Sequence, residues 1–164
     1  MKIYHGSNIT VTEPLAKAGR RNLDFGKGFY TTRLKSQAEK WAHLVASRKA
    51  RNAKSIVSIY DYDESLISAL GYTYKQFPSY DMEWLEFVVE CRQGKDTTDY
   101  DIVEGGVAND QVIDTVEDYE NGRITADQAL NQLKYKKPNN QICFRSQAAI
   151  DNLLHFMDAE TAEN

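Results

Sequence analysis

The sequence predicts a single domain of the α+β class. Its 164 residues, of which 41% are hydrophobic, are enough to bury one substantial core. Short runs of branched and aromatic residues, such as Ile56–Tyr60, are typical of β-strands. Helical patterns lie between these runs at irregular intervals, without the regular βαβ spacing of a parallel sheet. We expect residues 1–157 to form the domain and the acidic residues 158–164 to form a flexible tail.

The chain is predicted to begin with two strands separated by a loop. Residues 2–6 and Phe29–Thr32 are rich in branched and aromatic side chains, as strands are. The residues between them, 8–24, are polar and basic and include Pro14 and Gly19, which are typical of a loop.

A helix is expected to follow the second strand. Ser36 and Glu39 have the S-x-x-E spacing of a capping box, which predicts the start of this helix. The helix is expected to continue to about Asn52. Its apolar positions recur at helical spacing, and they are Trp41, Leu44, Val45 and the stem of Arg48.

The rest of the chain alternates between short strands and helices. Gly71 and Gly94 are placed to end helices, and Thr125 with Gln128 repeats the capping-box spacing. The predicted elements are a strand at Ile56–Tyr60, a short helix at 63–70, a helix capped by Asp81 and running through Glu90, short strands at Ile102–Val103 and Val107, helices at 110–119 and 126–134, a strand at Gln141–Phe144 and a last helix at about 147–156.

Composition argues against several classes of protein. There is no run of about 18 apolar residues, so no membrane span is expected. The start of the chain lacks an apolar signal-peptide core, and we expect a cytoplasmic location with no membrane partner. Cys91, Cys143 and three scattered histidines show no metal-ligand spacing, so no metal site is predicted.

Charge is distributed unevenly along the chain, whose net charge is −4. Residues 17–54 carry eleven Lys and Arg against Asp24 and Glu39, whereas residues 96–120 carry nine Asp and Glu and no basic residue. These runs are either solvated faces of helices and loops or a basic half that attracts phosphates. An acidic chain is not typical of a general nucleic-acid binder.

The segment Phe25–Tyr30, together with Trp41, is the main candidate for a binding site. Gly26 and Gly28 kink the chain before Tyr30, and the helix that follows brings a second ring back toward the first. Two rings beside a glycine-lined backbone can hold a flat heteroaromatic ligand. The alternative is that both aromatic residues are packed in the core.

Two other segments carry polar groups that can complete such a site. The first strand ends in His5-Gly6-Ser7, where a residue without a Cβ allows a ligand to approach the backbone. Gln141 is a polar residue that opens an otherwise apolar strand. Taken alone, a strand histidine is more often satisfied by a neighbour, and a glutamine at a strand start is more often on the surface.

Together these segments resemble the ADP-ribosyltransferases of the diphtheria toxin and poly(ADP-ribose) polymerase type. The motifs of that family are His-Gly-Ser or His-Gly-Thr, then Phe-Gly-Lys-Gly-Ile-Tyr with a second aromatic residue eleven positions later, then Asn-Glu-Tyr-Ile-Val-Tyr. The chain matches them with His5–Ser7, Phe25–Tyr30 and Trp41, and Asn140–Phe144. It also resembles a bacterial family of unassigned function within this superfamily, which shares the segment Val107–Asp110 and has His-Tyr-Gln where other members have His-Tyr-Glu.

The resemblance implies a split β-sandwich with flanking helices and NAD as co-substrate. His5, Tyr30 and Gln141 would be the catalytic residues: His5 would bind a ribose hydroxyl on the adenosine side, and Tyr30 would stack on the nicotinamide. Loop 8–24 would cover the bound NAD. The residues implied to bind NAD are Gly6, Ser7, Gly28, Thr31 and Trp41. Arg20 or Arg21 is assigned to the pyrophosphate from charge and location alone.

The implied activity is mono-ADP-ribosyl transfer from NAD to a macromolecular acceptor. The acidic composition favours a protein acceptor over a nucleic acid, and the resemblance suggests a bacterial toxin with a neutralising partner protein. Gln141 stands where well-known members have a carboxylate, which predicts slower turnover. Ala38 replaces a serine that helps hold the carboxamide, so that hydrogen bond is either missing or supplied by Ser7 or Thr31.

Several alternatives stay open from the sequence. Asn109 and Asp110 form either a loop and a helix cap, or a pair that replaces the missing carboxylate or orients the acceptor. The neutral Gln141 is also compatible with an inactive module that binds NAD or ADP-ribose. A plain interaction domain without a ligand is the third alternative.

Overall fold

Two separate β-sheets form the framework of the protein. The computed structural model describes residues 1–163, apart from the side chain of Asp110. One sheet has the strand order β1-β3-β7, with β1 at Lys2–Ser7, β3 at Ile56–Tyr62 and β7 at Leu154–Thr161. The other has the order β2-β6-β5-β4, with β2 at Phe29–Thr31, β6 at Asn140–Phe144, β5 at Ile102–Gly106 and β4 at Tyr74–Gln76.

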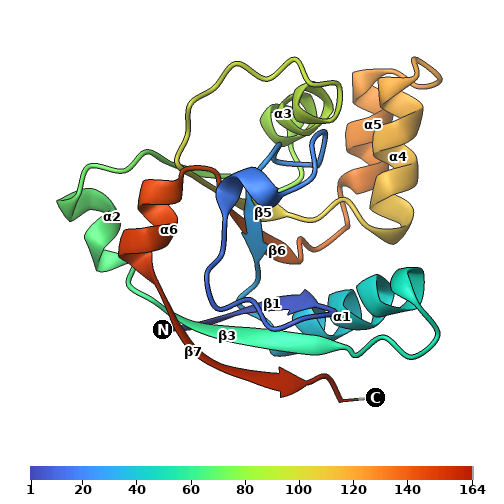
Figure 1. The fold of residues 1–164 in the computed structure, drawn as a ribbon. Coiled ribbons are helices and arrows are strands. Elements are labelled where there is room, and N and C mark those ends of the chain that lie inside the picture. Colours follow the sequence, from blue (N-terminus) through green and yellow to red (C-terminus); the bar gives the residue numbers. More distant parts are fainter. Residues whose placement is uncertain (164) are drawn as a thin grey trace.

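The two sheets are joined at a bridge between Tyr4 in β1 and Thr32, which directly follows β2. The N–H of Tyr4 donates to the carbonyl oxygen of Thr32 at 2.8 Å, and the N–H of Thr32 donates to that of Tyr4 at 2.9 Å. Within residues 1–163, β1 and β2 pair only through this bridge. The sheets therefore separate beyond it, and Figure 1 shows β1, β3 and β7 in a layer below β5 and β6.

Apolar side chains from both sheets meet in one core. Ile3 of β1 and Tyr60 of β3 are buried with Phe29 of β2 and Phe144 of β6. Helix α6, Gln147–Leu153, adds further apolar residues to the same core. These contacts hold the two sheets face to face and confirm the predicted α+β class.

Helix α1, Lys35–Lys49, packs on β1 and β3 through its small residues. Ala38, Ala42 and Ala46 are buried. A Cβ on Gly6 would lie 2.0 Å from the carbonyl oxygen of Ala38. The helix and the strand therefore approach more closely than any other residue at position 6 would permit.

The predicted capping box at the start of α1 is wrong. Leu34 is the N-cap, and no side chain caps the first turn. The hydroxyl of Thr32 instead accepts a hydrogen bond from the N–H of Leu34 at 3.2 Å and turns the chain into the helix. The helix ends at Lys49, ahead of the expected Asn52.

Three helices cover the outer face of the four-stranded sheet, and their predicted caps at Asp81 and Thr125 are confirmed. The Asp81 carboxylate accepts a hydrogen bond from the N–H of Trp84 at 2.9 Å, and Thr125 forms a capping box with Gln128. Trp84 lies in a core that these helices share with β5. The helices are α3 at Met82–Arg92, α4 at Asp110–Glu120 and α5 at Ala126–Leu133.

The end of the chain differs from the prediction. Helix α6 ends at Leu153, and Leu154–Thr161 form strand β7. Residues expected to be a flexible tail pair with β3, for example Ala159 with Ser58 and Thr161 with Ile56. The strand was not predicted because most of its side chains are exposed and several are charged. An edge strand of this kind pairs through its backbone and shows no apolar pattern in the sequence.

Smaller differences concern short elements. The predicted helix at 63–70 is α2 at Ser65–Ala69, and the loop at 8–24 contains one 3₁₀ turn at Ala16–Ala18. The strand predicted at Ile102–Val103 is β5, which extends to Gly106, whereas Val107 lies beyond its end and is not in a strand. The polar edge strand β4 was not predicted. Among the described residues, no helix has the length and apolar character needed to cross a membrane.

Candidate functional site

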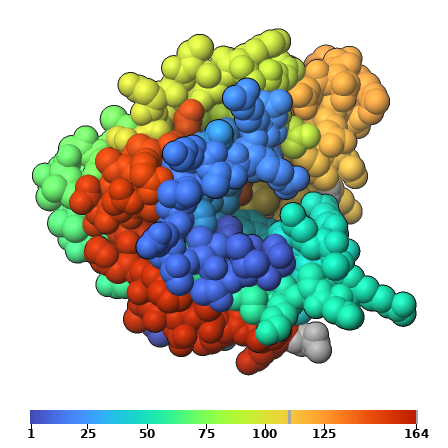
Figure 2. All heavy atoms as spheres, in the orientation of Figure 1, coloured from blue at the N-terminus to red at the C-terminus, as the bar shows by residue number. Residues whose placement is uncertain are grey.

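A cleft of about 590 Å³ opens where the two sheets separate. Its volume lies within the range of about 300–1,000 Å³ that is typical of ligand pockets. Figure 2 shows the hollow between the loop at 8–24, helix α1 and the segment that leads into α4. β1, β2, β6, α1 and the loop all contribute residues to its walls.

Most of the predicted site residues meet in this cleft. They come from three segments that are far apart in the sequence, and the structure brings these segments to one place. The predicted residues that line it are His5, Gly6, Arg20, Gly28, Tyr30, Trp41 and Gln141.

Three predicted residues do not line the cleft. Thr31 is fully buried, and its hydroxyl donates to the carbonyl oxygen of Ile142 at 3.3 Å. It therefore does not supply the hydrogen bond that a serine at the position of Ala38 would make. Ser7 is paired with β3, and Asn109 is the N-cap of α4. The side chain of Asp110 lies outside the described part of the structure.

His5 lines the cleft with its imidazole in a fixed orientation. Its Nδ1 lies 2.7 Å from the carbonyl oxygen of Tyr30, and because a carbonyl can only accept, Nδ1 carries the proton. Burial lowers the pKa of His5 below its ordinary value of 6.5, although the bond to Tyr30 opposes this. At neutral pH the ring is therefore uncharged, and its Nε2 is a hydrogen-bond acceptor.

The backbone of Gly6 faces the gap between the sheets. Hydrogen-bonding direction alternates along an antiparallel strand, and Tyr4 directs both of its backbone groups toward Thr32. Gly6, two residues later, therefore directs its N–H and C=O to the same side, away from its β3 neighbour Val57. These two groups can bind a planar amide, although the absence of a Cβ is required by α1 rather than by a ligand.

Tyr30 is anchored through its hydroxyl group. The hydroxyl donates to the carbonyl oxygen of Gly26 at 2.5 Å and accepts from the N–H of Phe25 at 3.1 Å. Gly26 has a φ of 75°, which favours glycine, so the tight turn that makes these bonds depends on this residue. The ring of Tyr30 is thus held in the wall of the cleft.

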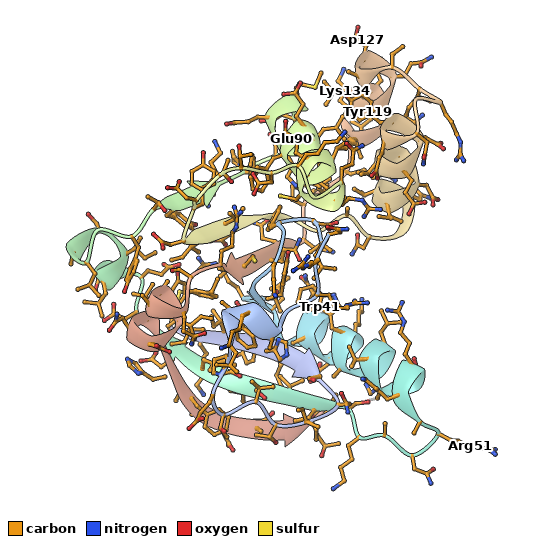
Figure 3. The ribbon with its side chains drawn as sticks, turned by 45° about the horizontal axis from the view of Figure 1, so that its top comes forward. Trp41, Arg51, Glu90, Tyr119, Asp127 and Lys134 are labelled. Carbon is orange, nitrogen blue, oxygen red and sulfur yellow. The ribbon has the colours of Figure 1, made fainter. Side chains whose placement is uncertain are left out.

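Trp41 belongs to an apolar face of α1 that points into the cleft (Figure 3). Leu44, Val45 and Arg48 continue this face, and Leu44 is 47% exposed. The predicted apolar face of the helix therefore lines the cleft, while its alanines face the core. Within the described residues, neither Trp41 nor Tyr30 pairs with another aromatic ring, and both line the cleft, although Tyr30 also packs against the core.

Gln141 is buried in β6 and not on the surface. It is 4% exposed, and its Nε2 has no hydrogen-bond partner among the described residues. It is one of several buried polar groups in the described residues without such a partner, and it lines the cleft. Gln141 is thus placed to contact a polar molecule that enters the cleft.

Residues 1–156 match the family described as "Protein of unknown function (DUF3990)". The chain belongs to this family. Every residue that lines the cleft of this DUF3990 protein lies within the matched range. No curated protein matches the chain, and no solved structure does.

Asp24 is a cleft residue of the DUF3990 protein that was not predicted from the sequence. Its carboxylate is 14% exposed and lines the cleft together with Gln141. Burial raises the pKa of Asp24, while hydrogen bonds from Ala108 and Arg92 and the nearby amide of Gln141 favour the charged form. Its signal in the sequence was weak: an isolated acid in a basic loop, directly before the Phe25 motif.

Proposed function

We propose that the protein is an NAD-dependent mono-ADP-ribosyltransferase that acts on a macromolecular acceptor. The observation that carries the proposal is the convergence of His5-Gly6, Tyr30 with Trp41, and Gln141 on one cleft. These are the segments that resemble the three family motifs. Two sheets that separate beyond a single bridge also agree with the split β-sandwich that the resemblance implies.

The groups in the cleft are suited to NAD. Tyr30 and Trp41 offer ring faces to the cationic nicotinamide, and each face contributes about 0.5–2 kcal/mol. The backbone N–H and C=O of Gly6 match the carboxamide, and the Nε2 of His5 accepts from a ribose hydroxyl. Arg20 lines the outer part of the cleft, where a cation can face the pyrophosphate.

The proposed reaction breaks the bond between nicotinamide and its ribose. Positive charge then develops on the ribose, as in glycoside hydrolysis, and groups whose interaction strengthens with that charge increase the rate. The amide oxygen of Gln141 can accept a hydrogen bond from a ribose hydroxyl, but it carries no charge. Because charge-assisted hydrogen bonds are about twice as strong as neutral ones, we expect slow turnover and no chain elongation.

A second candidate function is an inactive module that binds NAD or ADP-ribose. The neutral Gln141 at the position of a catalytic carboxylate favours this candidate. Both candidates predict NAD binding, and only the transferase predicts release of nicotinamide. The acceptor is proposed to be a protein, with a neutralising partner protein if the enzyme is a toxin.

Turnover and binding of NAD separate these functions. The purified protein is incubated with labelled NAD and a cell lysate, and free nicotinamide and labelled protein are measured. Binding is followed by the fluorescence of Trp41 in a Trp84→Phe background, since Trp84 is fully buried in another core. The transferase predicts both binding and slow release.

Gln141→Glu tests the role of this residue. A charged acceptor should raise nicotinamide release by about tenfold, because the gain of about 1.4 kcal/mol in transition-state stabilisation corresponds to that factor. Gln93→Glu adds the same charge at an exposed position outside the cleft and serves as the control. Binding without release in the native chain supports the module, and absence of both binding and release contradicts both functions.

A further inference from the structure

The cleft contains a carboxylate that no motif predicts. Asp24 precedes Phe25, which is fully buried in the core beneath the four-stranded sheet, so its backbone is fixed. Its side chain faces the cleft beside Gln141 and Tyr30. Asp24 is therefore an acidic residue in the same cleft as Gln141.

Two hydrogen bonds orient the carboxylate of Asp24. Its Oδ2 accepts from the N–H of Ala108 at 3.1 Å, and its Oδ1 accepts from Arg92 at 3.3 Å. Ala108 lies in the segment between β5 and α4, and Arg92 is the last residue of α3, so two segments distant in the sequence hold the carboxylate. The amide nitrogen of Gln141 has no hydrogen-bond partner among the described residues, but it lies close enough to the Asp24 carboxylate to favour the charged form of Asp24.

Arg92 forms ion pairs with two other carboxylates besides that of Asp24. The same guanidinium also contacts Glu120 at 3.3 Å and Glu117 at 3.4 Å. Three carboxylates thus share one cation, and the cluster keeps a net negative charge beside the cleft. A buried ion pair is weak support for a fold, because the cost of removing both charges from water offsets their attraction. A buried carboxylate that lines a cleft, held by hydrogen bonds that oppose the effect of burial, is typical of a functional site.

We infer that Asp24 is the catalytic carboxylate of this cleft and supplies the negative charge that Gln141 lacks. The inference rests on the proposed function. As the bond between the ribose carbon and the nicotinamide nitrogen breaks, its electron pair moves to the nitrogen and neutralises the pyridinium. The Asp24 carboxylate stabilises the cationic ribose. The acceptor then forms a bond to the same carbon, and its proton passes to Asp24 and on to water.

The test compares Asp24→Asn with Glu117→Gln. Asparagine keeps the shape and can still accept from Ala108, but it removes the charge from the cleft. Glu117→Gln removes a carboxylate from the same Arg92 cluster at a position that is 51% exposed and does not line the cleft. For native protein and both variants, NAD affinity is measured by Trp41 fluorescence and turnover by nicotinamide release.

We expect Asp24→Asn to lose about 100-fold in nicotinamide release, as removal of one group that stabilises transition-state charge typically does. Its NAD affinity should change less than about tenfold, and Glu117→Gln should change release less than about threefold. Adding Gln141→Glu to Asp24→Asn should recover release, because it returns a carboxylate to the cleft. Release by Asp24→Asn at the native rate, or equal losses in both single variants, would overturn the inference.

The native protein gives a second measurement that does not depend on the folding of a variant. A carboxylate in the cleft should make NAD, whose nicotinamide ring is cationic, bind at least about tenfold more tightly than NADH, whose ring is neutral, and equal affinities would overturn the inference. Failure of the proposed function has a different result. A native chain that neither binds NAD nor releases nicotinamide would reject both, whereas native release that survives Asp24→Asn rejects the role of Asp24 alone.

Discussion

At the scale of single residues, burial determines the chemistry of the cleft more than residue type does. His5 is a titratable residue that the fold keeps neutral, because its site in the split between the sheets disfavours the charged ring. Gln141 shows the opposite case. It is an ordinary surface residue by type, and yet it is almost fully buried with an unpaired amide group.

The lowered pKa of His5 predicts how stability depends on pH. The unfolded chain binds the His5 proton near the ordinary pKa of 6.5, whereas the folded chain binds it only at a lower pH. His5 therefore contributes its full stability above pH 6.5, and this contribution is lost as pH falls toward the folded pKa.

Urea unfolding at a series of pH values between neutral and mildly acidic measures this slope. We expect His5→Gln to reduce the change of the free energy of unfolding with pH in that window. His155→Gln removes one imidazole at an exposed position and is the control. Identical slopes in the native chain and His5→Gln would contradict the burial of a neutral ring.

The sequence predicted the residues of the cleft unequally. His5, Tyr30, Trp41 and Gln141 were found because they belong to motifs with fixed spacing. Asp24 was missed because its importance depends on Ala108 and Arg92, which reach it from elements distant in the sequence.

At the scale of elements, the close contact between α1 and β1 fixes the helix that carries Trp41 into the cleft wall. Gly6→Ala places a Cβ 2.0 Å from the carbonyl oxygen of Ala38 and 2.7 Å from the N of Ala42. These are backbone atoms, so the helix itself must move. We expect the free energy of unfolding to fall by about 3 kcal/mol, the upper part of the range for overpacking.

Gly122→Ala is the control for this variant. Gly122 has a φ of 71°, but no atom lies within 4 Å of the place that a Cβ would take, so the cost is only the backbone strain of about 1–2 kcal/mol. Gly6→Ala should also weaken NAD binding, since α1 carries Trp41. Equal stability losses and unchanged NAD affinity would show that α1 accommodates the methyl group.

Strand β7 gives a second prediction at this scale. Truncation after Met157 removes the pairs from Asp158 to Thr161 with β3 and the ion pair of Glu160 with Lys35 on α1. The melting temperature should fall by several degrees, because each kcal/mol corresponds to about 2–4 °C in a chain of this size. Truncation after Ala162 keeps these contacts and should melt close to the native chain. A flexible tail would make the two truncations equal.

The accuracy of the predicted elements followed the strength of their local signals. Caps at Asp81 and Thr125 were found because a side chain and a nearby N–H form the whole interaction. The start of α1 was wrong because Thr32, a strand residue before the helix, turns the chain there. β7 was missed because its partner β3 is about a hundred residues away and its own side chains are exposed.

At the scale of the whole molecule, the cleft lies between two sheets that share a core and one bridge. A ligand that contacts His5 in one sheet and Gln141 in the other ties both together. NAD at 100 times its Kd should therefore stabilise the native chain by about 2.7 kcal/mol and raise the melting temperature.

Thermal melting with and without NAD checks this prediction, with Trp41→Ala as the variant that loses one ring of the site. The shift should shrink strongly in Trp41→Ala. A plain interaction domain would melt at the same temperature with and without NAD, and Trp41→Ala would then only lower the melting temperature itself.

The hydroxyl anchor of Tyr30 has a consequence for engineering this protein. Because that hydroxyl forms hydrogen bonds with the backbone of Phe25 and Gly26, residues 24–30 form one turn, here called the cassette, that carries both the Asp24 carboxylate and the Tyr30 ring. Substitutions inside the cassette move both groups together, so they should change the rate of nicotinamide release and the affinity for NAD at the same time. Attempts to redirect the protein to a new acceptor should leave the cassette intact and vary the exposed loop before it, where Ile9 and Leu15 border the same cleft.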